Sequence, residues 1–478
     1  MKRTKIICTM GPTTSDREVV LQLAKSGMNI ARFNFSHGSH EEQKGRMDMI
    51  KSIREEVGRP IAILLDTKGP EIRTGLLKGG QKVTLVEGQE FVLTTEQIEG
   101  DNTRVSITYD GLAEDVEPGK KILIDDGLIE LEIKAIEGTE IICTVINGGD
   151  LGQRKGVNVP NVPVRLPAIT EKDKEDIIFG IEQDVDFIAA SFVRNAEAII
   201  EIKELLKEHN SRYIPIIAKI ENEEGINNID EILEVADGIM VARGDLGVEI
   251  PAHELPYLQK MLIQKCNDCL KPVITATQML DSMMRNPRPT RAEVTDVANA
   301  VYDGTDAVML SGETANGKYP VEALKMMVKI VEDAESHLDY QAIIGKAKKQ
   351  RQRSIANTIS YSAVAAAEHL GAKCIIIPTT SGSTARVVSK FKTKATIVGV
   401  TPDDAVYRRM AIFRGLYPLK SVPHYSTEEI FNESIRITKE AGLAEVGDIV
   451  VVTAGIPSTI VKDAEEGMSN MMQITVVK

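Results

Sequence analysis

Ile214-Pro-Ile-Ile-Ala-Lys-Ile-Glu221 is a short apolar run that ends in a lysine and a glutamate, and Gly238-Ile-Met-Val-Ala-Arg-Gly-Asp245 repeats this form after a helical stretch. Such runs, joined by a helix, are typical of a strand-helix-strand unit in a parallel sheet. Side chains two positions apart lie on the same face of a strand, so we expect Lys219 and Glu221 to share one face. Asp245 follows one unit later, which predicts a lysine and two carboxylates at the ends of successive strands.

The same apolar form recurs along much of the chain. The runs are residues 5–8, 30–35, 61–65, 187–190, 214–218, 239–241, 273–276 and 307–310. Most are joined by amphipathic helical stretches with start and stop signals, for example a Ser15-Asp-Arg-Glu18 capping box and Gly27. Strands that alternate with helices predict an α/β protein with a parallel sheet.

Polar or charged residues stand at or just beyond the strand ends. They are Thr9, Ser36, Asp66, Ser191, Lys219, Arg243, Thr277 and Ser311. Eight such units predict a (β/α)8 TIM barrel, in which catalytic groups gather at the carboxyl ends of the strands. An open doubly wound sheet is the alternative.

Two regions depart from the barrel pattern. Residues 70–167 are rich in Gly, Val, Ile and Thr and alternate at 82–86 and 130–136, which predicts an inserted all-β domain, a β-barrel lid over the barrel mouth. A helix start is predicted again at Thr170-Glu-Lys-Asp173. A basic stretch at 346–353 precedes new helix and strand units, so we expect a C-terminal α/β domain over 345–478. Residues 1–69 and 168–344 are then the catalytic barrel.

Composition narrows the function classes. The net charge of −13 argues against a nucleic-acid footprint, which depends on clustered Lys and Arg. Five scattered cysteines do not resemble a disulfide framework. The apolar start stops at Cys8-Thr-Met-Gly-Pro12, and no apolar stretch approaches a membrane span. We therefore expect a cytoplasmic protein that binds neither nucleic acid nor membrane.

Lys219, Glu221 and Asp245 suggest a divalent metal site that handles phosphate. Two carboxylates in one pocket repel each other and lose hydration unless a cation lies between them. A hard cation such as Mg2+ prefers oxygen ligands. A solvated surface charge cluster is the alternative, because Glu223 and Glu224 follow directly.

The run Asn29-Ile-Ala-Arg-Phe-Asn-Phe-Ser-His-Gly38 alternates, so Arg32, Asn34 and Ser36 would share one face. Arg32 could neutralise a phosphate, and the oxygens of Asn34 and Ser36 suit a monovalent cation or a nucleotide. A hydrogen-bond network inside the barrel is the alternative.

Three loops could contact a ligand. Leu65-Asp-Thr-Lys-Gly-Pro-Glu-Ile-Arg73 looks like a hinge that also lines a site, because charged groups crowd a Gly-Pro turn. Ser311-Gly-Glu-Thr-Ala-Asn-Gly-Lys318 imitates a P-loop, but Tyr319 stands where Ser or Thr would hold Mg2+, which favours a plain strand-to-helix turn. Thr379-Thr-Ser-Gly-Ser-Thr384 could cradle a phosphate or merely cap a helix.

Seven motifs, in their order and spacing, closely resemble those of the pyruvate kinase family. They are Asn34-Phe-Ser-His-Gly38, Leu65-Asp-Thr-Lys-Gly-Pro-Glu-Ile-Arg-Thr-Gly75, Lys219-Ile-Glu-Asn222, Ala242-Arg-Gly-Asp-Leu-Gly247, Thr275-Ala-Thr-Gln-Met-Leu280, Pro287-Arg-Pro-Thr-Arg-Ala-Glu293 and Leu310-Ser-Gly-Glu-Thr-Ala315. They span the first two-thirds of the chain. The last third resembles the family's regulatory domain less specifically.

The resemblance implies transfer of a phosphoryl group from phosphoenolpyruvate to ADP, giving pyruvate and ATP in the last step of glycolysis. It also implies Mg2+ (or Mn2+), usually K+, and a homotetramer. By similarity, Glu221 and Asp245 would hold Mg2+, while Lys219 and Arg32 would neutralise the phosphoryl group. The residues that match the family's K+ ligands are Asn34, Ser36, Asp66 and Thr67, and Glu71 matches the K+-dependent form of its motif.

Other roles carry over by the same resemblance. Thr277 lies where the family places the proton path to the enolate. The helix start formed by Ala242, Arg243, Gly244 and Asp245 would receive the substrate carboxylate. The residues that would face the nucleotide are Asn34, His37, Arg73 and Lys155.

The C-terminal domain would bind an allosteric effector. The residues that match the family's effector phosphate loop are Thr379, Thr380, Ser381, Gly382, Ser383 and Thr384. Residues 452–459 lack the Trp and the Arg-rich loop with which animal forms bind fructose 1,6-bisphosphate. The effector stays open, and the chain looks more like bacterial forms that respond to AMP or a monophosphorylated sugar.

Two other functions remain as alternatives. A different metal-dependent barrel enzyme acting on enolpyruvate or oxaloacetate would share Lys219, Glu221 and Asp245, but would not need ADP-facing groups or an inserted lid. A non-catalytic sugar-phosphate sensor would keep residues 379–384 and lose the catalytic groups, which are all present.

Overall fold

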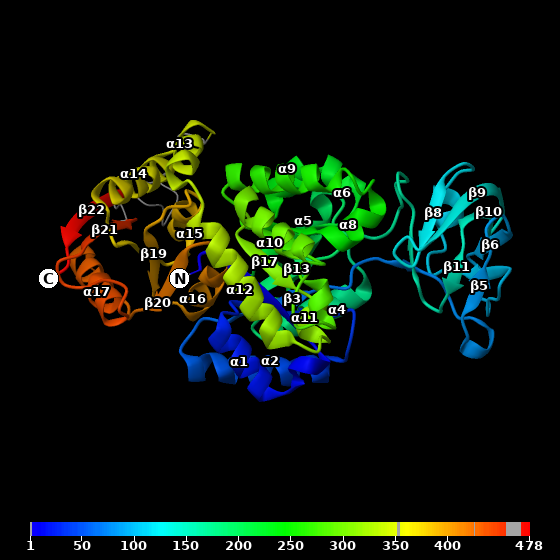
Figure 1. Ribbon diagram of the computed structural model, residues 1–478, viewed down its shortest axis with the longest axis horizontal. Coiled ribbons are helices and arrows are strands. Elements are labelled where there is room, and N and C mark those ends of the chain that lie inside the picture. Colours follow the sequence, from blue (N-terminus) through cyan, green and yellow to red (C-terminus); the bar gives the residue numbers. More distant parts are fainter. Residues whose placement is uncertain (1, 351–353, 425, 456–469) are drawn as a thin grey trace.

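Three bodies follow one another along the long axis of the molecule: the C-terminal domain, the barrel and the inserted β domain (Figure 1). The computed structural model describes residues 2–350, 354–424, 426–455 and 470–478. The insert lies at the opposite end of the barrel from the C-terminal domain (Figure 1).

The central body is a closed barrel of eight parallel strands in the order β1-β17-β16-β15-β14-β13-β3-β2. The strands are β1 (Lys5–Met10), β2 (Ile30–Asn34), β3 (Ala62–Asp66), β13 (Phe187–Ala190), β14 (Ile216–Ile220), β15 (Gly238–Ala242), β16 (Val273–Ala276) and β17 (Ala307–Leu310). All eight predicted apolar runs are barrel strands, buried by the barrel interior on one side and by helices on the other. The TIM barrel is confirmed, and the open doubly wound sheet is excluded.

Helices surround the barrel. They are α1 (Arg17–Ser26), α2 (His40–Val57), α4 (Glu171–Glu182), α5 (Ala196–Glu208), α6 (Glu223–Asn227), α7 (Ile229–Val235), α8 (Arg243–Glu249), α9 (Leu255–Asp268), α10 (Arg291–Asp303), α11 (Gly312–Ala315) and α12 (Pro320–Ser336). The helix start predicted at Thr170 is confirmed, because Thr170 and Asp173 form a capping box. The capping box predicted at Ser15 is wrong: a 3-10 turn extends through Ser15, so the extended Asp16 caps α1 instead.

The insert leaves the barrel after β3 and consists mainly of strands, as predicted. Its elements are β4 (Ile72–Arg73), β5 (Val83–Leu85), β6 (Glu90–Thr94), β7 (Arg104–Ser106), α3 (Leu112–Asp115), β8 (Lys121–Ile124), β9 (Ile129–Glu137), β10 (Glu140–Asn147), β11 (Gly149–Leu151) and β12 (Gly156–Asn158). Seven of these strands form one sheet, which runs from β4 to β7. A bridge between Thr74 and Ile107 joins its two ends, so the sheet curls around its own core.

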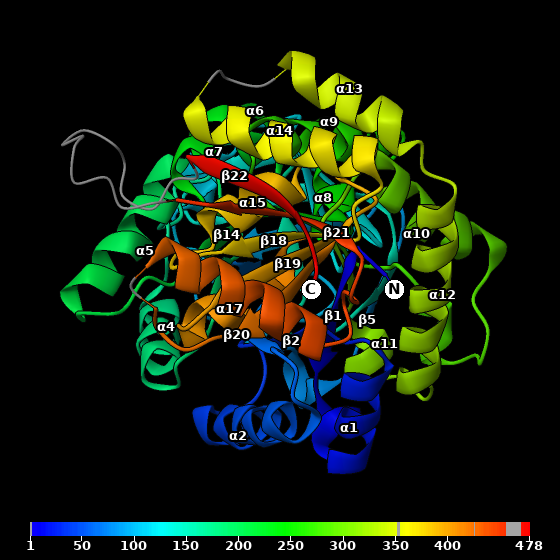
Figure 2. The ribbon, with the colours of Figure 1, turned by 90° about the vertical axis from the view of Figure 1, so that its left-hand side faces the viewer.

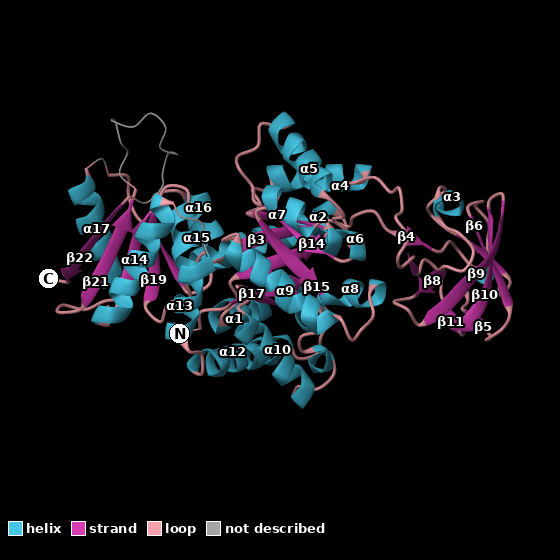
Figure 3. Cartoon of the chain, turned by 90° about the horizontal axis from the view of Figure 1, so that it is seen from above, coloured by secondary structure: helices cyan, strands magenta, loops and turns pink. Residues whose placement is uncertain are grey.

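The C-terminal domain is a five-stranded sheet with helices on both faces (Figures 2 and 3). Its elements are α13 (Tyr340–Gln350), α14 (Ile355–Leu370), β18 (Cys374–Pro378), α15 (Ser383–Ser389), β19 (Thr396–Thr401), α16 (Asp404–Arg409), β20 (Leu416–Lys420), α17 (Thr427–Glu440), β21 (Ile449–Ala454) and β22 (Met471–Val476). Ile375 belongs to a core that includes residues of α14. Ile376 belongs to a second core that includes Phe431 of α17. The strand β22 is antiparallel to β21 and forms an edge of the sheet.

Within the described ranges, no helix is both long enough and apolar enough to cross a membrane.

Candidate active site

Lys219 is the centre of a buried polar network at the carboxyl ends of the barrel strands. Its Nζ lies 3.1 Å from Asp66 Oδ1, 2.9 Å from Glu221 Oε1 and 2.7 Å from Ser191 Oγ. Arg32 donates from Nε to Asp66 Oδ2 over 2.5 Å. Strands β14, β3 and β2 carry the three charged groups Lys219, Asp66 and Arg32, and barrel closure brings them into contact.

The charges in this network stabilise one another. Burial alone would raise the pKa of Asp66, but the positive charges of Arg32 and Lys219 outweigh it and hold that pKa below its usual value. Burial would lower the pKa of Lys219, whereas the carboxylates of Asp66 and Glu221 raise it by more. Both groups are therefore charged at neutral pH, and a buried ammonium is available to an anionic ligand.

Glu221 is a buried carboxylate, and the charge of the partly buried Asp245 disfavours its ionisation. Burial raises the pKa of Glu221 to about 7, helped by the negative charge of Asp245 and opposed by Lys219. Burial likewise raises the pKa of Asp245. The Phe192 N–H donates to Glu221 Oε2 over 2.6 Å, which fixes the carboxylate in place. Such a pair would be stabilised by a cation bound between its members.

The donor set fits Mg2+ bound together with substrate. In the part of the chain that the structure describes, no three His, Cys, Asp or Glu side chains form a cluster that could hold a metal by themselves. Mg2+ usually keeps several waters and binds through one or two carboxylates plus substrate oxygens. Glu221 and Asp245 are two such carboxylates.

The four residues predicted to hold K+ lie together at the ends of β2 and β3. Asn34 is the register partner of Asp66. Asn34 Oδ1 accepts the Ser36 N–H over 3.0 Å, and Thr67 Oγ1 accepts the Ser191 N–H over 3.1 Å. These groups form one polar cluster next to the Lys219 network, and the K+ role itself stays a prediction.

Thr277 follows β16 in a strained conformation. Its φ is 67°, and that of Gln278 is 55°. A β-branched residue with positive φ is an outlier, and such strain clusters at functional sites. Thr277 Oγ1 accepts the Gly244 N–H over 2.6 Å and donates to Ala276 O over 2.6 Å. The hydroxyl is thus held at the start of α8, the helix whose first turn contains Asp245.

Arg243 opens α8, and its backbone forms part of the predicted carboxylate site. Its side chain does something else: it donates to the carbonyls of Ala276 and Thr277 and pairs with Asp296 over 2.6 Å.

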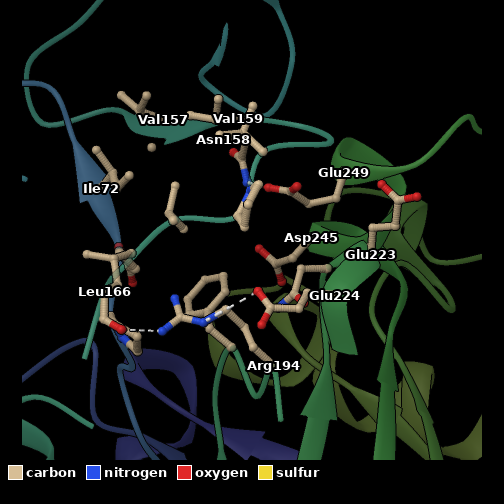
Figure 4. Close-up of a pocket in the computed structure, with 18 of the residues that line it drawn as sticks. Ile72, Val157, Asn158, Val159, Leu166, Arg194, Glu223, Glu224, Asp245 and Glu249 are labelled. Carbon is tan, nitrogen blue, oxygen red and sulfur yellow. Dashed lines mark hydrogen bonds and ion pairs between the residues drawn. The ribbon is translucent and has the colours of Figure 1, made fainter. Parts of the chain in front are cut away.

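A cavity of about 600 Å³ lies between the insert and the barrel mouth (Figure 4). The insert lines it with Arg73, Lys155 and Asn158, and the barrel lines it with Asp245 and Glu249. Asn158 Nδ2 donates to Glu249 Oε1 over 2.6 Å and so links the two bodies. Two residues predicted to face a nucleotide therefore share a cavity with a predicted Mg2+ ligand.

The other two predicted nucleotide contacts, Asn34 and His37, do not line this cavity and lie on β2 and the turn after it. Asn34 ends β2, and His37 is exposed on the turn that leads into α2. Lys155 Nζ pairs with Asp125 over 2.8 Å, and Arg73 pairs with Glu71. Both cations are thus held at the cavity wall by carboxylates of the insert.

Both connections of the insert are anchored to the barrel. At the first, the Gly69 N–H donates to Asp173 Oδ1 over 2.9 Å. Gly69 has a φ of 72°, and a Cβ there would lie 2.8 Å from Ser191 Cβ, so no side chain fits. At the second, Arg194 Nη2 donates to the carbonyl of Leu166 (Figure 4) and to that of Pro167.

The predicted effector loop is a hydroxyl-rich turn between β18 and α15. Gly382 precedes the helix with a φ of 82°, and its N–H donates to Thr379 Oγ1 over 2.9 Å. Ser381 Oγ and Ser383 Oγ lie 3.0 Å apart. Thr380 precedes them, and Thr384 is buried in the first turn of α15. Of the segment 452–459, residues 456–459 lie outside the described residues.

The P-loop imitation is a strand-to-helix turn, as expected. The buried Glu313 carboxylate accepts the N–H groups of Leu280 over 2.9 Å and Ser311 over 2.7 Å. A carboxylate that belongs to the turn itself therefore accepts these two N–H groups.

Two polar residues near the site, Ser191 and Thr9, were not assigned a role from the sequence. Ser191 bridges Lys219 and Thr67, since its Oγ lies 2.7 Å from Lys219 Nζ and 2.7 Å from Thr67 O. Thr9 Oγ1 accepts from Arg32 Nη1 over 3.0 Å. Thr9 is the last but one residue of β1, and Ser191 follows β13. Their position near strand ends was the one signal in the sequence.

Comparisons with known proteins agree with this arrangement. The model "Pyruvate kinase, barrel domain" matches residues 1–324, and "Pyruvate kinase, alpha/beta domain" matches residues 357–475. The pyruvate kinase of Clostridium acetobutylicum is 50% identical over 100% of both chains. That of Geobacillus stearothermophilus is 52% identical over 100% of this chain and 80% of its own.

A solved structure has the same fold. The crystal structure of a pyruvate kinase from Cryptosporidium parvum superimposes with a TM-score of 0.95 at 39% identity, covering 100% of this chain and 96% of that one. Two family models together match most of the chain, and a relative is 50% identical over its full length. The chain therefore belongs to the pyruvate kinase family.

Proposed function

We propose that this site transfers the phosphoryl group of phosphoenolpyruvate to ADP, giving pyruvate and ATP. The observation that carries the proposal is the position of the Lys219 ammonium. It is buried between Asp66 and Glu221 and lies beside Arg32. A cavity at the same barrel mouth is lined by Arg73 and Lys155. The first set of cations suits the transferred phosphoryl group, and the second suits the phosphates of a nucleotide.

In the reaction, the bond between phosphorus and the C2 oxygen of phosphoenolpyruvate breaks as a β-phosphate oxygen of ADP bonds to phosphorus. Lys219 and Arg32 neutralise charge on the phosphoryl oxygens in flight. Mg2+, held by Glu221 and Asp245, would supply Lewis-acid stabilisation and orient the substrate oxygens. The backbone of residues 242–245 receives the substrate carboxylate.

The enolate left behind takes a proton at C3 to become pyruvate. By the family resemblance, that proton passes through Thr277, whose hydroxyl is held 2.6 Å from the Gly244 nitrogen at the start of α8. K+ would be bound by oxygens of Asn34, Ser36, Asp66 and Thr67. Arg73, Lys155, Asn34 and His37 face the nucleotide.

The insert acts as a lid. Its two connections, near Gly69 and Leu166, would serve as hinges, and its closure would exclude water from the transferring group.

Regulation and assembly form a second part of the proposal. A phosphorylated effector, AMP or a sugar phosphate, binds the turn from Thr379 to Thr384. The chain forms a homotetramer, and the exposed apolar side chains of the edge strand β22, Ile474 and Val476, suit a contact between copies. Light scattering at several concentrations tests the assembly.

The activity is tested by following pyruvate formation from phosphoenolpyruvate with Mg2+, with and without ADP, K+, AMP, ribose 5-phosphate and fructose 1,6-bisphosphate. We expect turnover that needs ADP and Mg2+ and rises with K+, and the best activator identifies the effector. Turnover without ADP would favour another metal-dependent barrel enzyme. Effector binding without turnover would favour a sensor.

A further inference from the structure

The guanidinium of Arg243 is fully occupied by protein acceptors. An arginine side chain has five N–H donors. Its contacts are Nε to Ala276 O at 3.1 Å, Nη1 to Gln259 Oε1 at 3.3 Å and to Asp296 Oδ1 at 2.6 Å, and Nη2 to Thr277 O at 2.7 Å and to Met279 Sδ at 2.7 Å. Five acceptors therefore use five donors, and the side chain is only 10% exposed. The guanidinium serves the protein rather than a ligand.

Two of these acceptors are the carbonyls of the strained segment itself. Ala276 O precedes the Thr277 nitrogen, and Thr277 O follows its Cα, so the arginine binds the backbone on both sides of the residue. A β-branched residue in a left-handed conformation persists only where the surrounding structure holds it there. The rigid, planar fork of an arginine presents donors from separate nitrogens in a fixed geometry, whereas a lysine presents a single nitrogen on a flexible stem.

The guanidinium of Arg243 is itself held by side chains of two other helices. Asp296 of α10 holds Nη1 in a charge-assisted hydrogen bond, and Gln259 of α9 contacts the same nitrogen. Two helices of the outer ring thus fix the direction in which the guanidinium presents Nε and Nη2.

Two adjacent residues, Arg243 and Gly244, hold the backbone and the hydroxyl of Thr277. The Arg243 side chain holds its backbone, and the Gly244 N–H holds its hydroxyl. Asp245, a predicted Mg2+ ligand, comes next in the same turn of α8. A shift of Arg243 would move the threonine hydroxyl relative to the predicted metal and substrate positions.

We propose that Arg243, held by Asp296, is a positioning residue that keeps the Thr277 hydroxyl in place for protonation of the enolate. This inference rests on the role proposed above for Thr277. It gives Arg243 a task that no contact with substrate requires.

The experiment compares Arg243→Lys, Asp296→Asn, Thr277→Val and the double variant Arg243→Lys/Thr277→Val in the full-length protein. Two steps are measured separately: hydrogen exchange of the pyruvate methyl group in D2O by NMR, and steady-state phosphoryl transfer. Lys265→Gln is the matched control, because its ion pair with Asp230 joins α9 to α7 and contacts neither Arg243 nor Thr277.

Arg243→Lys is expected to slow methyl exchange by on the order of 100-fold, as for a misplacement of about 1 Å, with the KM for phosphoenolpyruvate within about twofold. Asp296→Asn should lower exchange in the same direction by less, and it replaces Arg243→Lys should that variant not fold. The double variant should be no slower than Thr277→Val, because Arg243 acts through Thr277.

Other results overturn the proposal. Additive losses in the double variant, or a raised KM for phosphoenolpyruvate in Arg243→Lys, would show that Arg243 contacts substrate on its own. Normal exchange in Arg243→Lys and Asp296→Asn beside slow exchange in Thr277→Val would remove the positioning role alone. Normal exchange in Thr277→Val would remove the role of Thr277 in the proposed function as well.

Discussion

At the scale of single residues, burial decides how the site responds to pH. Glu221 lies among apolar strands, beside a second carboxylate, and its pKa is raised to about 7 even though Lys219 is 2.9 Å away. A carboxylate must lose its proton to ligate a metal. Metal binding and proton release are therefore coupled at this position.

We predict that Mg2+ affinity rises with pH between about 6 and 8. Below its pKa, Glu221 is mostly protonated, so affinity should fall by about tenfold for each unit of pH, and above the pKa it should level off. Calorimetric titration of Mg2+ at a series of pH values measures this. Glu221→Gln is the control, with weak affinity and a much flatter pH dependence. Wild-type affinity that does not change with pH would contradict the assignment.

Part of this site could be predicted from the sequence, because it depends on the local geometry of one strand. Spacing within one strand placed Lys219 and Glu221 on one face, and the structure has them in contact. The Arg243 fork and the left-handed Thr277 could not be foreseen, because both depend on how neighbouring strand ends meet after the barrel closes. Ser191 was visible only as a polar residue after a strand.

At the scale of elements, apolar runs predicted every barrel strand, since each is buried on both faces and reads as a short continuous run. The insert was predicted as all-β, but its strand order was not. Pairings such as Thr74 with Ile107 join segments far apart in sequence, which alternation cannot specify. The misplaced cap at Ser15 shows the same limit at a helix end, where a 3-10 turn displaced the expected start.

The return connection of the insert gives a prediction at this scale. Arg194 binds the carbonyls of Leu166 and Pro167, so Arg194→Met should loosen the hinge. We expect kcat to fall and the KM for ADP to rise together, by roughly threefold to tenfold, with Mg2+ affinity unchanged. Steady-state kinetics measures both.

The matched control is Arg165→Met on the same connection. Arg165 is exposed and pairs with Asp115 inside the insert, so its loss leaves the anchor to the barrel in place. Kinetics of Arg194→Met that match those of Arg165→Met would contradict a hinge role for Arg194.

At the scale of the whole molecule, the two faces of the barrel have different tasks. The insert covers the carboxyl ends of the strands, and the C-terminal domain packs on their amino ends (Figure 1). There Lys390 pairs with Asp306, just before β17, and Arg408 pairs with Asp186, just before β13. This division agrees with barrels in which chemistry lies at one face and stability at the other.

The buried pair at this contact should matter for stability. Lys390 and Asp306 are each 1% exposed, so Lys390→Met would leave a buried carboxylate without that partner, at a cost of about 3–5 kcal/mol. The midpoint of urea unfolding should fall accordingly. Lys420→Met removes an exposed pair with Asp404 and should cost less than about 1 kcal/mol. Equal midpoints for the two variants would show that the buried pair contributes nothing special.

The central claim is that the Lys219 ammonium neutralises the phosphoryl group during transfer, and Lys219→Met tests it most directly. Rapid-quench single-turnover measurements with saturating phosphoenolpyruvate, ADP and Mg2+ give the transfer rate, and equilibrium titration gives phosphoenolpyruvate binding. We predict binding close to wild type and transfer slower by on the order of 100- to 1,000-fold, while the exposed Lys318→Met keeps the normal rate. Near-normal transfer in Lys219→Met would contradict the account.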